Sequence, residues 1–128
     1  MPRMKRKQFE TFTDGLLSIC SVEERKIIET KLKDIRFGNR TIGERRYFDA
    51  QTAGNKLSKL LSIPAETLKI KNIETLDIVI LESQKGVSDP GQYRIVQIQE
   101  KFDATPPAVY LSLEKIVQLY ADRRPDRE

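Results

Sequence analysis

The side chains that most often carry out chemistry in proteins are scarce in this sequence. It contains no histidine and a single cysteine, Cys20. Histidine is the usual general base and a common metal ligand, and structural zinc sites need several cysteine or histidine ligands. The sequence therefore offers neither a cysteine-rich zinc site nor a histidine-dependent active site.

Carboxylates and glycine-rich loops are the remaining candidates for chemistry. Five aspartates are in principle able to surround a hard cation, but their spacing matches no cation-binding loop; they are Asp14, Asp34, Asp49, Asp77 and Asp103. No G-x-S-x-G, P-loop or G-x-G-x-x-G motif occurs, and Gly38 and Gly43 lie too far apart to cradle a phosphate in this way. We expect no enzyme activity, no metal and no cofactor.

The excess positive charge lies near the N-terminus. The chain has 23 lysines and arginines against 19 acidic residues. Removing the four basic residues that precede the first acid, Glu10, leaves equal numbers of the two signs; these are Arg3, Lys5, Arg6 and Lys7. We interpret residues 1–13 as a basic arm with Phe9 and Phe12 as anchors. Such an arm usually aids solubility, and less often contacts nucleic acid.

Length and hydropathy favour one domain without a membrane span. A chain of 128 residues buries enough surface to fold without disulfides. No run reaches the roughly 18 apolar residues of a membrane span, and no apolar signal core follows the basic arm. Cys20 lies in the apolar run Leu16 to Cys20, which indicates a buried thiol and a reducing compartment.

Alternating apolar residues predict a series of short strands. A charged turn at Glu23 to Arg25 joins the first two in an expected hairpin. The continuously apolar Ile78 to Leu81 suits a strand covered on both faces, and the adjacent Ile95 and Val96 indicate a bulge. The expected strands are 16–22, 26–37, 57–63, 68–70, 78–81, 93–99 and 109–113.

The segments between the strands complete the expected architecture. Gly38-Asn39 ends the second strand in a turn, and a short helix follows near residues 44–54. Residues 82–92 form a long loop, Phe102 to Pro107 a connection, and 119–128 a charged tail that is disordered from Ala121 onward. The prediction is a mainly β protein, with residues 14–118 forming a small antiparallel β-barrel or sandwich of six to seven strands with one short helix.

One segment also fits a different fold. Ala53 to Glu66 is similar to the turn and recognition helix of a helix-turn-helix DNA-binding regulator. That domain needs several consecutive helices, whereas the flanking segments have strand patterns and Pro64 would cut the recognition helix short. We keep this regulator as an alternative hypothesis.

The order of several short motifs resembles the head closure proteins of tailed phages, which are also described as head-tail joining, connector or stopper proteins. The resemblance covers roughly residues 14 to 118, with Tyr47-Phe48 where many relatives carry a tryptophan. It rests most on the pair YRIVQIQ (93–99) and LSLEK (111–115), which resembles the last two strands of that family. The other motifs are Ile35 to Gly38 with Arg40, Thr41 and Gly43; Leu60-Leu61 with Ile63-Pro64; Asp77 to Ile80; and Asp103 with Pro106.

This resemblance implies a virion structural protein without enzyme activity. Such proteins form a homo-oligomeric ring in the neck, between the portal or adaptor proteins and the tail or tail-terminator proteins, and retain packaged DNA. The implied location is the virion neck, and the host cytoplasm during assembly. Intersubunit or DNA-facing contacts are expected at Arg36, Arg40, Arg45 and Arg46, and contact with the channel or a partner at Lys85, Gly86, Val87, Ser88 and Asp89. A β-domain adaptor that binds some other protein is a further alternative.

Overall fold

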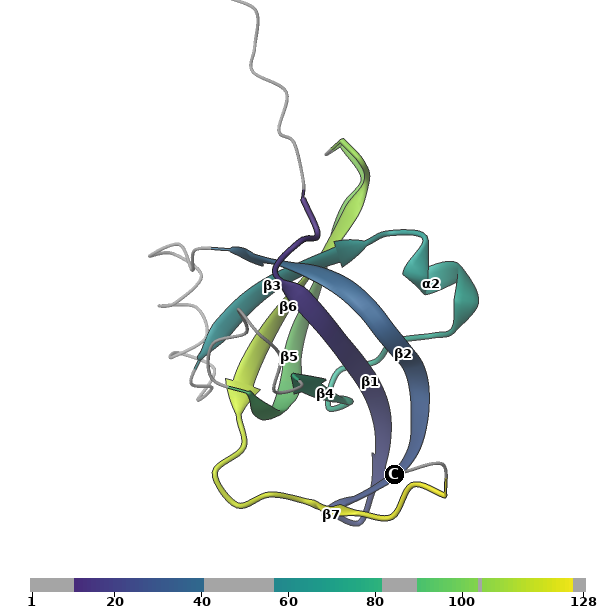
Figure 1. Cartoon of the computed structure of the whole chain (residues 1–128), viewed down its shortest axis with the longest axis vertical. Helices are drawn as coiled ribbons and strands as arrows, with labels where there is room; N and C mark the ends of the chain where they lie inside the picture. The colour runs from purple at the N-terminus through teal and green to yellow at the C-terminus, as the bar shows by residue number, and fades with distance from the viewer. Residues whose placement is uncertain (1–10, 41–56, 82–89, 104, 126–128) are drawn as a thin grey trace, which may run out of the picture.

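The computed structural model describes residues 11–40, 57–81, 90–103 and 105–125 (Figure 1). These residues are mainly in strands, with one helix of four residues. The elements are β1 (Gly15–Glu23), β2 (Lys26–Arg40), β3 (Lys59–Pro64), α2 (Thr67–Ile70), β4 (Ile78–Leu81), β5 (Gly91–Lys101), β6 (Ala108–Lys115) and β7 (Ala121–Asp122). The expected mainly β fold is confirmed. Within the described ranges, no helix has the length and apolar character to cross a membrane.

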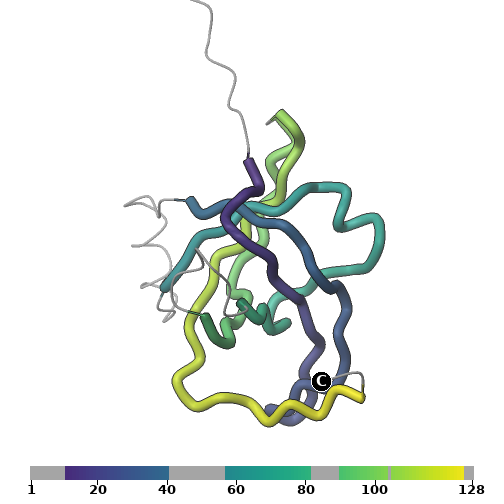
Figure 2. Tube along the Cα trace, viewed as in Figure 1, coloured from purple at the N-terminus to yellow at the C-terminus, as the bar shows by residue number. Residues whose placement is uncertain are grey.

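The strands form one sheet that curls back on itself (Figure 2). Its order is β1-β4-β5-β6-β3-β2-β7, and β1 also pairs with β2. That additional pairing closes a cycle of six strands, so the fold is barrel-like. All pairs within the cycle are antiparallel, and the short β7 joins β2 in parallel outside it. Closure removes most of the exposed strand edges that would otherwise favour aggregation.

The expected hairpin of β1 and β2 is present, and its turn is tight. Glu24 and Arg25 connect the strands with φ angles of 49° and 61°. Two consecutive residues with positive φ are characteristic of the type I′ turn, whose twist matches that of a two-stranded ribbon. The register contains shifts between Leu17 and Ile19 and between Ser21 and Val22. These irregularities bend the hairpin, so that β1 reaches both β2 and β4.

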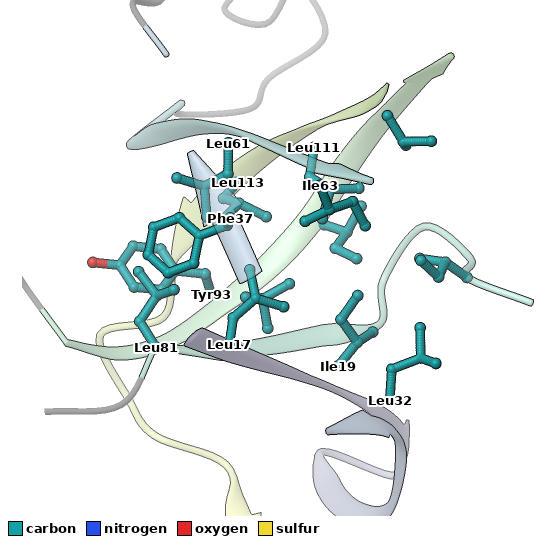
Figure 3. Close-up of a cluster of buried hydrophobic side chains, with 14 residues drawn as sticks. Leu17, Ile19, Leu32, Phe37, Leu61, Ile63, Leu81, Tyr93, Leu111 and Leu113 are labelled. Carbon is teal, nitrogen blue, oxygen red and sulfur yellow. The ribbon is translucent and has the colours of Figure 1, made fainter. Parts of the chain in front are cut away.

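The inside of the closed sheet is filled by side chains from every strand of the cycle (Figure 3). Successive strand residues point to opposite faces, and the residues at alternate positions meet in this core. Phe37 and Tyr93 are its largest members and are almost fully buried. The other labelled members in Figure 3 are Leu17, Ile19, Leu32, Leu61, Ile63, Leu81, Leu111 and Leu113.

A second apolar cluster lies on the outer face of β1, β2 and β4. Cys20, Ile27 and Ile78 are buried there beneath Ile116, with Tyr120 packed against them. β4 therefore has its alternate residues in two different clusters, which confirms that Ile78 to Leu81 is covered on both faces. The buried thiol of Cys20 is also confirmed.

The expected bulge is confirmed in β5. Its register with β6 shifts between Ile95 and Gln97, which leaves Val96 as the extra residue. The shift explains why two apolar residues, Ile95 and Val96, are adjacent in this strand. Ile95 is fully buried in the core, and because Val96 is the extra residue, the next residue to pack against the core is Ile98 and not Gln97. Bulges of this kind increase strand bending, as a small closed sheet requires.

Several segment predictions were wrong. Gly38-Asn39 does not end β2, because β2 continues to Arg40 and pairs with β3. Leu68 to Ile70 is helical, since Ala65 and Glu66 accept the N–H groups of Leu68 and Lys69 and favour a local turn over sheet pairing. Gly91 and Gln92, assigned to the long loop, begin β5 and pair with β4. The expected helix near residues 44–54 lies outside the described residues.

The helix-turn-helix alternative fails at its recognition helix. Lys59 to Pro64 forms β3, an inner strand hydrogen-bonded to β2 on one side and β6 on the other. Leu61 and Ile63 alternate into the core, as the sequence pattern indicated for a strand. A helix that reads the major groove is therefore absent from residues 59–64.

One buried ion pair fixes the segment between α2 and β4. Lys31 of β2 and Asp77 lie 2.8 Å apart, and their side chains are only 13% and 8% exposed. Asp77 also accepts the N–H of Glu74 at 2.9 Å, and its backbone carbonyl accepts the N–H of Ile95 at 3.0 Å. Asp77 therefore connects β2, the 74–77 turn and β5.

We expect Asp77→Ala to lower the free energy of unfolding by about 2–4 kcal/mol, because it leaves Lys31 as a buried charge without its partner. Urea denaturation of both proteins measures the change. The matched control is Glu29→Ala, which removes an exposed partner of Lys71 at 2.8 Å and should have little effect. Equal effects of the two substitutions would contradict this role of Asp77.

Gly38 is required by a backbone contact. A Cβ atom there would lie 2.1 Å from the carbonyl oxygen of Thr11, where the chain before β1 crosses β2. Asp14 secures the crossing, because its carboxylate accepts the N–H of Asn39 at 2.7 Å.

Gly38→Ala should lower the free energy of unfolding by roughly 1–3 kcal/mol, since the crossing segment must move to admit the methyl group. Thermal denaturation measures the loss. Removing residues 1–11 from both proteins should remove most of the difference between them, because Thr11 then no longer blocks the position. A loss of the same size in the truncated pair would mean that another contact is responsible.

Candidate interaction surfaces

The structure places little chemistry in the part of the chain that it describes. There, no group of three or more histidine, cysteine, aspartate or glutamate side chains is arranged to hold a metal ion. Burial raises the pKa of the Cys20 thiol, although nearby Arg124 opposes the shift. A thiol with a raised pKa is a poor nucleophile.

Two of the four arginines singled out in the sequence can be located. Arg36 and Arg40 lie four residues apart on β2, on either side of Gly38, and Phe37 between them points into the core. Arg36 is exposed, whereas Arg40 is half-buried and donates a hydrogen bond to the carbonyl of Asn39 at 2.7 Å. Arg45, Arg46 and the loop residues Lys85 to Asp89 lie outside the described residues.

The surroundings of Arg36 are not purely positive. Arg36 lines a shallow hollow between β2 and α2 together with Asp34 and Glu66. Two carboxylates beside one guanidinium offset its charge and weaken its attraction for a phosphate backbone. A DNA-facing role for Arg36 stays a prediction.

An apolar groove of about 590 Å³ lies at one end of the sheet. Its walls come from the segment before β1, from the end of β3 with α2, and from the connection between β5 and β6. We refer to it as the proline groove; its main apolar residues are Phe12, Pro64, Leu68, Phe102, Pro106 and Pro107, with Glu66 and Lys69 as its charged residues.

Local sequence explains why this groove stays open. Pro106 and Pro107 donate no backbone hydrogen bonds, so the β5–β6 connection does not extend the ladder over the groove. Pro64 ends β3 at its pairing with Ala108 of β6, and the chain then turns into α2. Phe102, the first residue after β5, is 57% exposed. A large exposed aromatic beside an apolar groove is typical of a protein-binding surface.

The segment after β6 lies at the other end of the molecule. In Figure 1 it runs in yellow below the sheet, away from α2 and the β5–β6 connection. Gln92 holds it with two side-chain hydrogen bonds, donating to the carbonyl of Tyr120 at 3.1 Å and accepting the N–H of Tyr120 at 2.8 Å. Between the buried Ile116 and the half-buried Tyr120, Val117 and Leu119 are 89% and 66% exposed.

Arg124 secures the end of this segment. Its guanidinium forms two hydrogen bonds with the Asp122 carboxylate, at 2.9 and 2.7 Å. It also donates to the Thr30 hydroxyl at 3.1 Å and lies 3.7 Å from the Cys20 sulfur. The expectation of a disordered tail was thus wrong for residues up to 125, since Ala121 and Asp122 pair with β2 and Arg124 packs against β1 and β2.

Sequence reasoning missed both apolar ends of the molecule. The sequence predicts Phe12 as an anchor of the arm and Phe102 to Pro107 as a connection. The spacing of these two segments does not indicate that they share one groove. The charge of residues 121–128 predicts disorder, whereas Arg124 pairs with Asp122 and packs beside Thr30 and Cys20. The two prolines were the best local signal of an unusual surface.

Comparison with known proteins adds no relative. No protein family, no curated protein and no solved structure matches this chain.

Arg124→Ala should increase the rate at which Ellman's reagent labels Cys20 by roughly tenfold or more, because charge-assisted hydrogen bonds worth about 1.5–3 kcal/mol no longer hold the covering segment closed. The substitution also removes a nearby positive charge, which alone would raise the thiol pKa further and slow labelling. Faster labelling therefore reports opening of the segment.

The matched control is Arg123→Ala, which removes an equal charge but keeps the backbone hydrogen bond from residue 123 to the Ile27 carbonyl. Its labelling rate should stay close to that of the unmodified protein. Equal rates for the two variants would contradict a specific role of Arg124.

Proposed function

We propose that this protein is a structural component of the neck of a tailed phage or prophage. In this proposal, copies of the chain form a ring between the portal or adaptor proteins and the tail, close the filled head and retain its DNA. The protein acts by binding neighbouring proteins, and DNA passes through the ring without being read in sequence.

The observation that carries the proposal is the agreement between the motif order and the strands. YRIVQIQ lies within β5 and LSLEK lies within β6, and these two strands pair along nearly their whole length. They are the last two strands of the closed cycle, as in the family that the sequence resembles. Of the other quoted motifs, Ile35 to Arg40 lies in β2, Leu60 to Pro64 in β3 and Ile78 to Ile80 in β4. Asp103 and Pro106 lie in the β5–β6 connection, and Thr41 and Gly43 lie outside the described residues.

The character of the surface also supports a role in assembly. The thiol is buried, the described carboxylates form no metal-binding group, and the conspicuous surface features are an apolar groove and an exposed apolar segment. Exposed apolar surface in a small domain usually marks a binding site for another protein. The same groove favours the second candidate, an adaptor that binds an unrelated protein.

Gene replacement in the encoding phage tests the neck role. Without the protein, packaged heads should lose their DNA and remain free of tails, and the unmodified gene should restore both. Deleting Lys85 to Asp89 should leave the fold intact but abolish DNA retention, because this segment is expected to contact the channel or a partner. Circular dichroism of the purified variant provides the control for folding.

Two results would count against the proposal. Normal tailed particles without the protein would exclude the neck role and favour the adaptor. Full DNA retention by the loop deletion would exclude the channel role of residues 85–89 but leave the rest of the proposal in place.

A further inference from the structure

A hollow with a positive lining lies at the end of the molecule opposite the proline groove. It has a volume of about 530 Å³, and its walls come from the β1–β2 turn, from β5 and β6, and from the segment after β6. In Figure 1 that segment runs in yellow to β7, which pairs with the start of β2. We call it the cationic hollow; its charged residues are Arg25, Arg94, Lys115 and Glu114. Three cations against one carboxylate leave a net charge of +2.

The charges just outside this lining do not reverse its sign. Four exposed charged residues flank the β1–β2 turn and β7, two of each sign; they are Glu23, Glu24, Lys26 and Arg123. Asp122 on β7 is already paired with Arg124 at 2.7 Å. The excess positive charge therefore belongs to the cationic hollow itself.

Neither the proline groove nor the hollow beside Arg36 is positive. The groove is lined by one carboxylate, Glu66, and one ammonium, Lys69, so its lining has no net charge. The hollow beside Arg36 sets one guanidinium against two carboxylates. Of these three surfaces, the cationic hollow is therefore the one whose net charge attracts anions.

Arg94 has hydrogen-bonding capacity left over. A guanidinium carries five N–H donors, but the Glu114 carboxylate lies 3.5 Å from Nη2 of Arg94, and its Nε is buried and donates to no described residue. Arg124, in contrast, reaches the Asp122 carboxylate and the Thr30 hydroxyl within 3.1 Å. The side chain of Arg94 is 34% exposed, so its terminal nitrogens can bind an acceptor in the hollow.

Arg25 is held at the hollow without being neutralised. Its guanidinium lies 5.8 Å from the centre of the Tyr120 ring, a cation–π contact that leaves the positive charge in place. Tyr120 is fixed in turn by its two hydrogen bonds with Gln92. Positive charges gathered around one hollow repel each other, and a bound anion would offset that repulsion.

We propose that the cationic hollow binds a phosphate group. Its cations come from three different elements, the β1–β2 turn, β5 and β6, and this arrangement suits a tetrahedral anion with several oxygens better than a planar carboxylate. An arginine can bind two phosphate oxygens at once through parallel N–H···O bonds. The group can belong to a free phosphate ion or to the backbone of a nucleic acid, since both present such oxygens. The inference does not depend on the neck role.

Titration of the ¹⁵N-labelled full chain with sodium phosphate, with the ionic strength held constant by sodium chloride, tests the site. The amide signals of Arg25, Arg94 and residues 115–118 should shift and saturate in the millimolar range, whereas those of residues 33–36 should not. Sodium acetate should bind at least roughly fivefold more weakly, because a carboxylate offers only two oxygens to the same donors.

Substitutions of equal charge make the outcome specific. Arg25→Gln and Lys115→Gln should each weaken phosphate binding at least about fivefold, because each removes a charge-assisted contact. The matched control is Lys26→Gln, next to Arg25 but outside the lining, which should change binding less than about twofold. An equal loss from Lys26→Gln would reduce the effect to general charge and overturn the site.

Glu114 gives a test of the opposite sign. Glu114→Gln should tighten phosphate binding by roughly threefold or more, because it removes the one carboxylate of the lining and the charged partner of Arg94. Glu100→Gln, an equal charge change at an exposed position of β5 outside the lining, should leave binding unchanged. Weaker binding by Glu114→Gln, or an equal gain from Glu100→Gln, would contradict the proposal.

Binding of a short DNA duplex, followed by fluorescence anisotropy, identifies the source of the phosphate. Weaker duplex binding by Arg25→Gln and Lys115→Gln, but not by Lys26→Gln, would assign the hollow to a nucleic-acid backbone. Saturable phosphate binding together with duplex binding that ignores these substitutions would assign it to a free phosphate. If phosphate causes no localised shifts and duplex binding does not depend on Arg25 and Lys115, the proposal is wrong. None of these results requires the protein to be part of a phage neck, so the two proposals can fail separately.

Discussion

The structure depends on the double pairing of β1. This strand binds β2 through the hairpin and β4 through Leu17 to Cys20, and without the second pairing the sheet would remain open. Closure buries the alternate residues of six strands in one core and leaves few free edges. The bends that make it possible come from shifted register in the hairpin and at Val96. Both ends of the molecule, with their apolar surfaces, are positioned by this closed frame.

The strands were predictable because alternation is a local pattern that the closed sheet then preserves. Leu61 and Ile63 point inward as their spacing indicated, and the adjacent Ile95 and Val96 correctly indicated a bulge. One error arose where a distant contact decides, and another where a local turn does. Gly38 has the local character of a turn residue, but its function is to admit the backbone of Thr11 across β2. Leu68 to Ile70 alternates weakly, and the turn at Ala65 and Glu66 makes it helical.

The candidate sites were less predictable than the fold, for a physical reason. A groove or a charge environment belongs to residues from separate segments. Arg36 is one of four arginines close together in the sequence, yet in space it shares a hollow with Asp34 and Glu66. The proline groove combines Phe12, Pro64 and Phe102 from three segments. These three residues come together because the segment before β1 crosses β2, the chain turns from β3 into α2, and the β5–β6 connection lies beside both.

The central claim is that this closed sheet is one unit of a ring in a phage neck. Electron cryomicroscopy of assembled particles from the encoding phage would test it most directly. The account predicts density for the six-strand cycle, repeated around the channel between portal and tail. A well-resolved neck with no density that fits this sheet would contradict it.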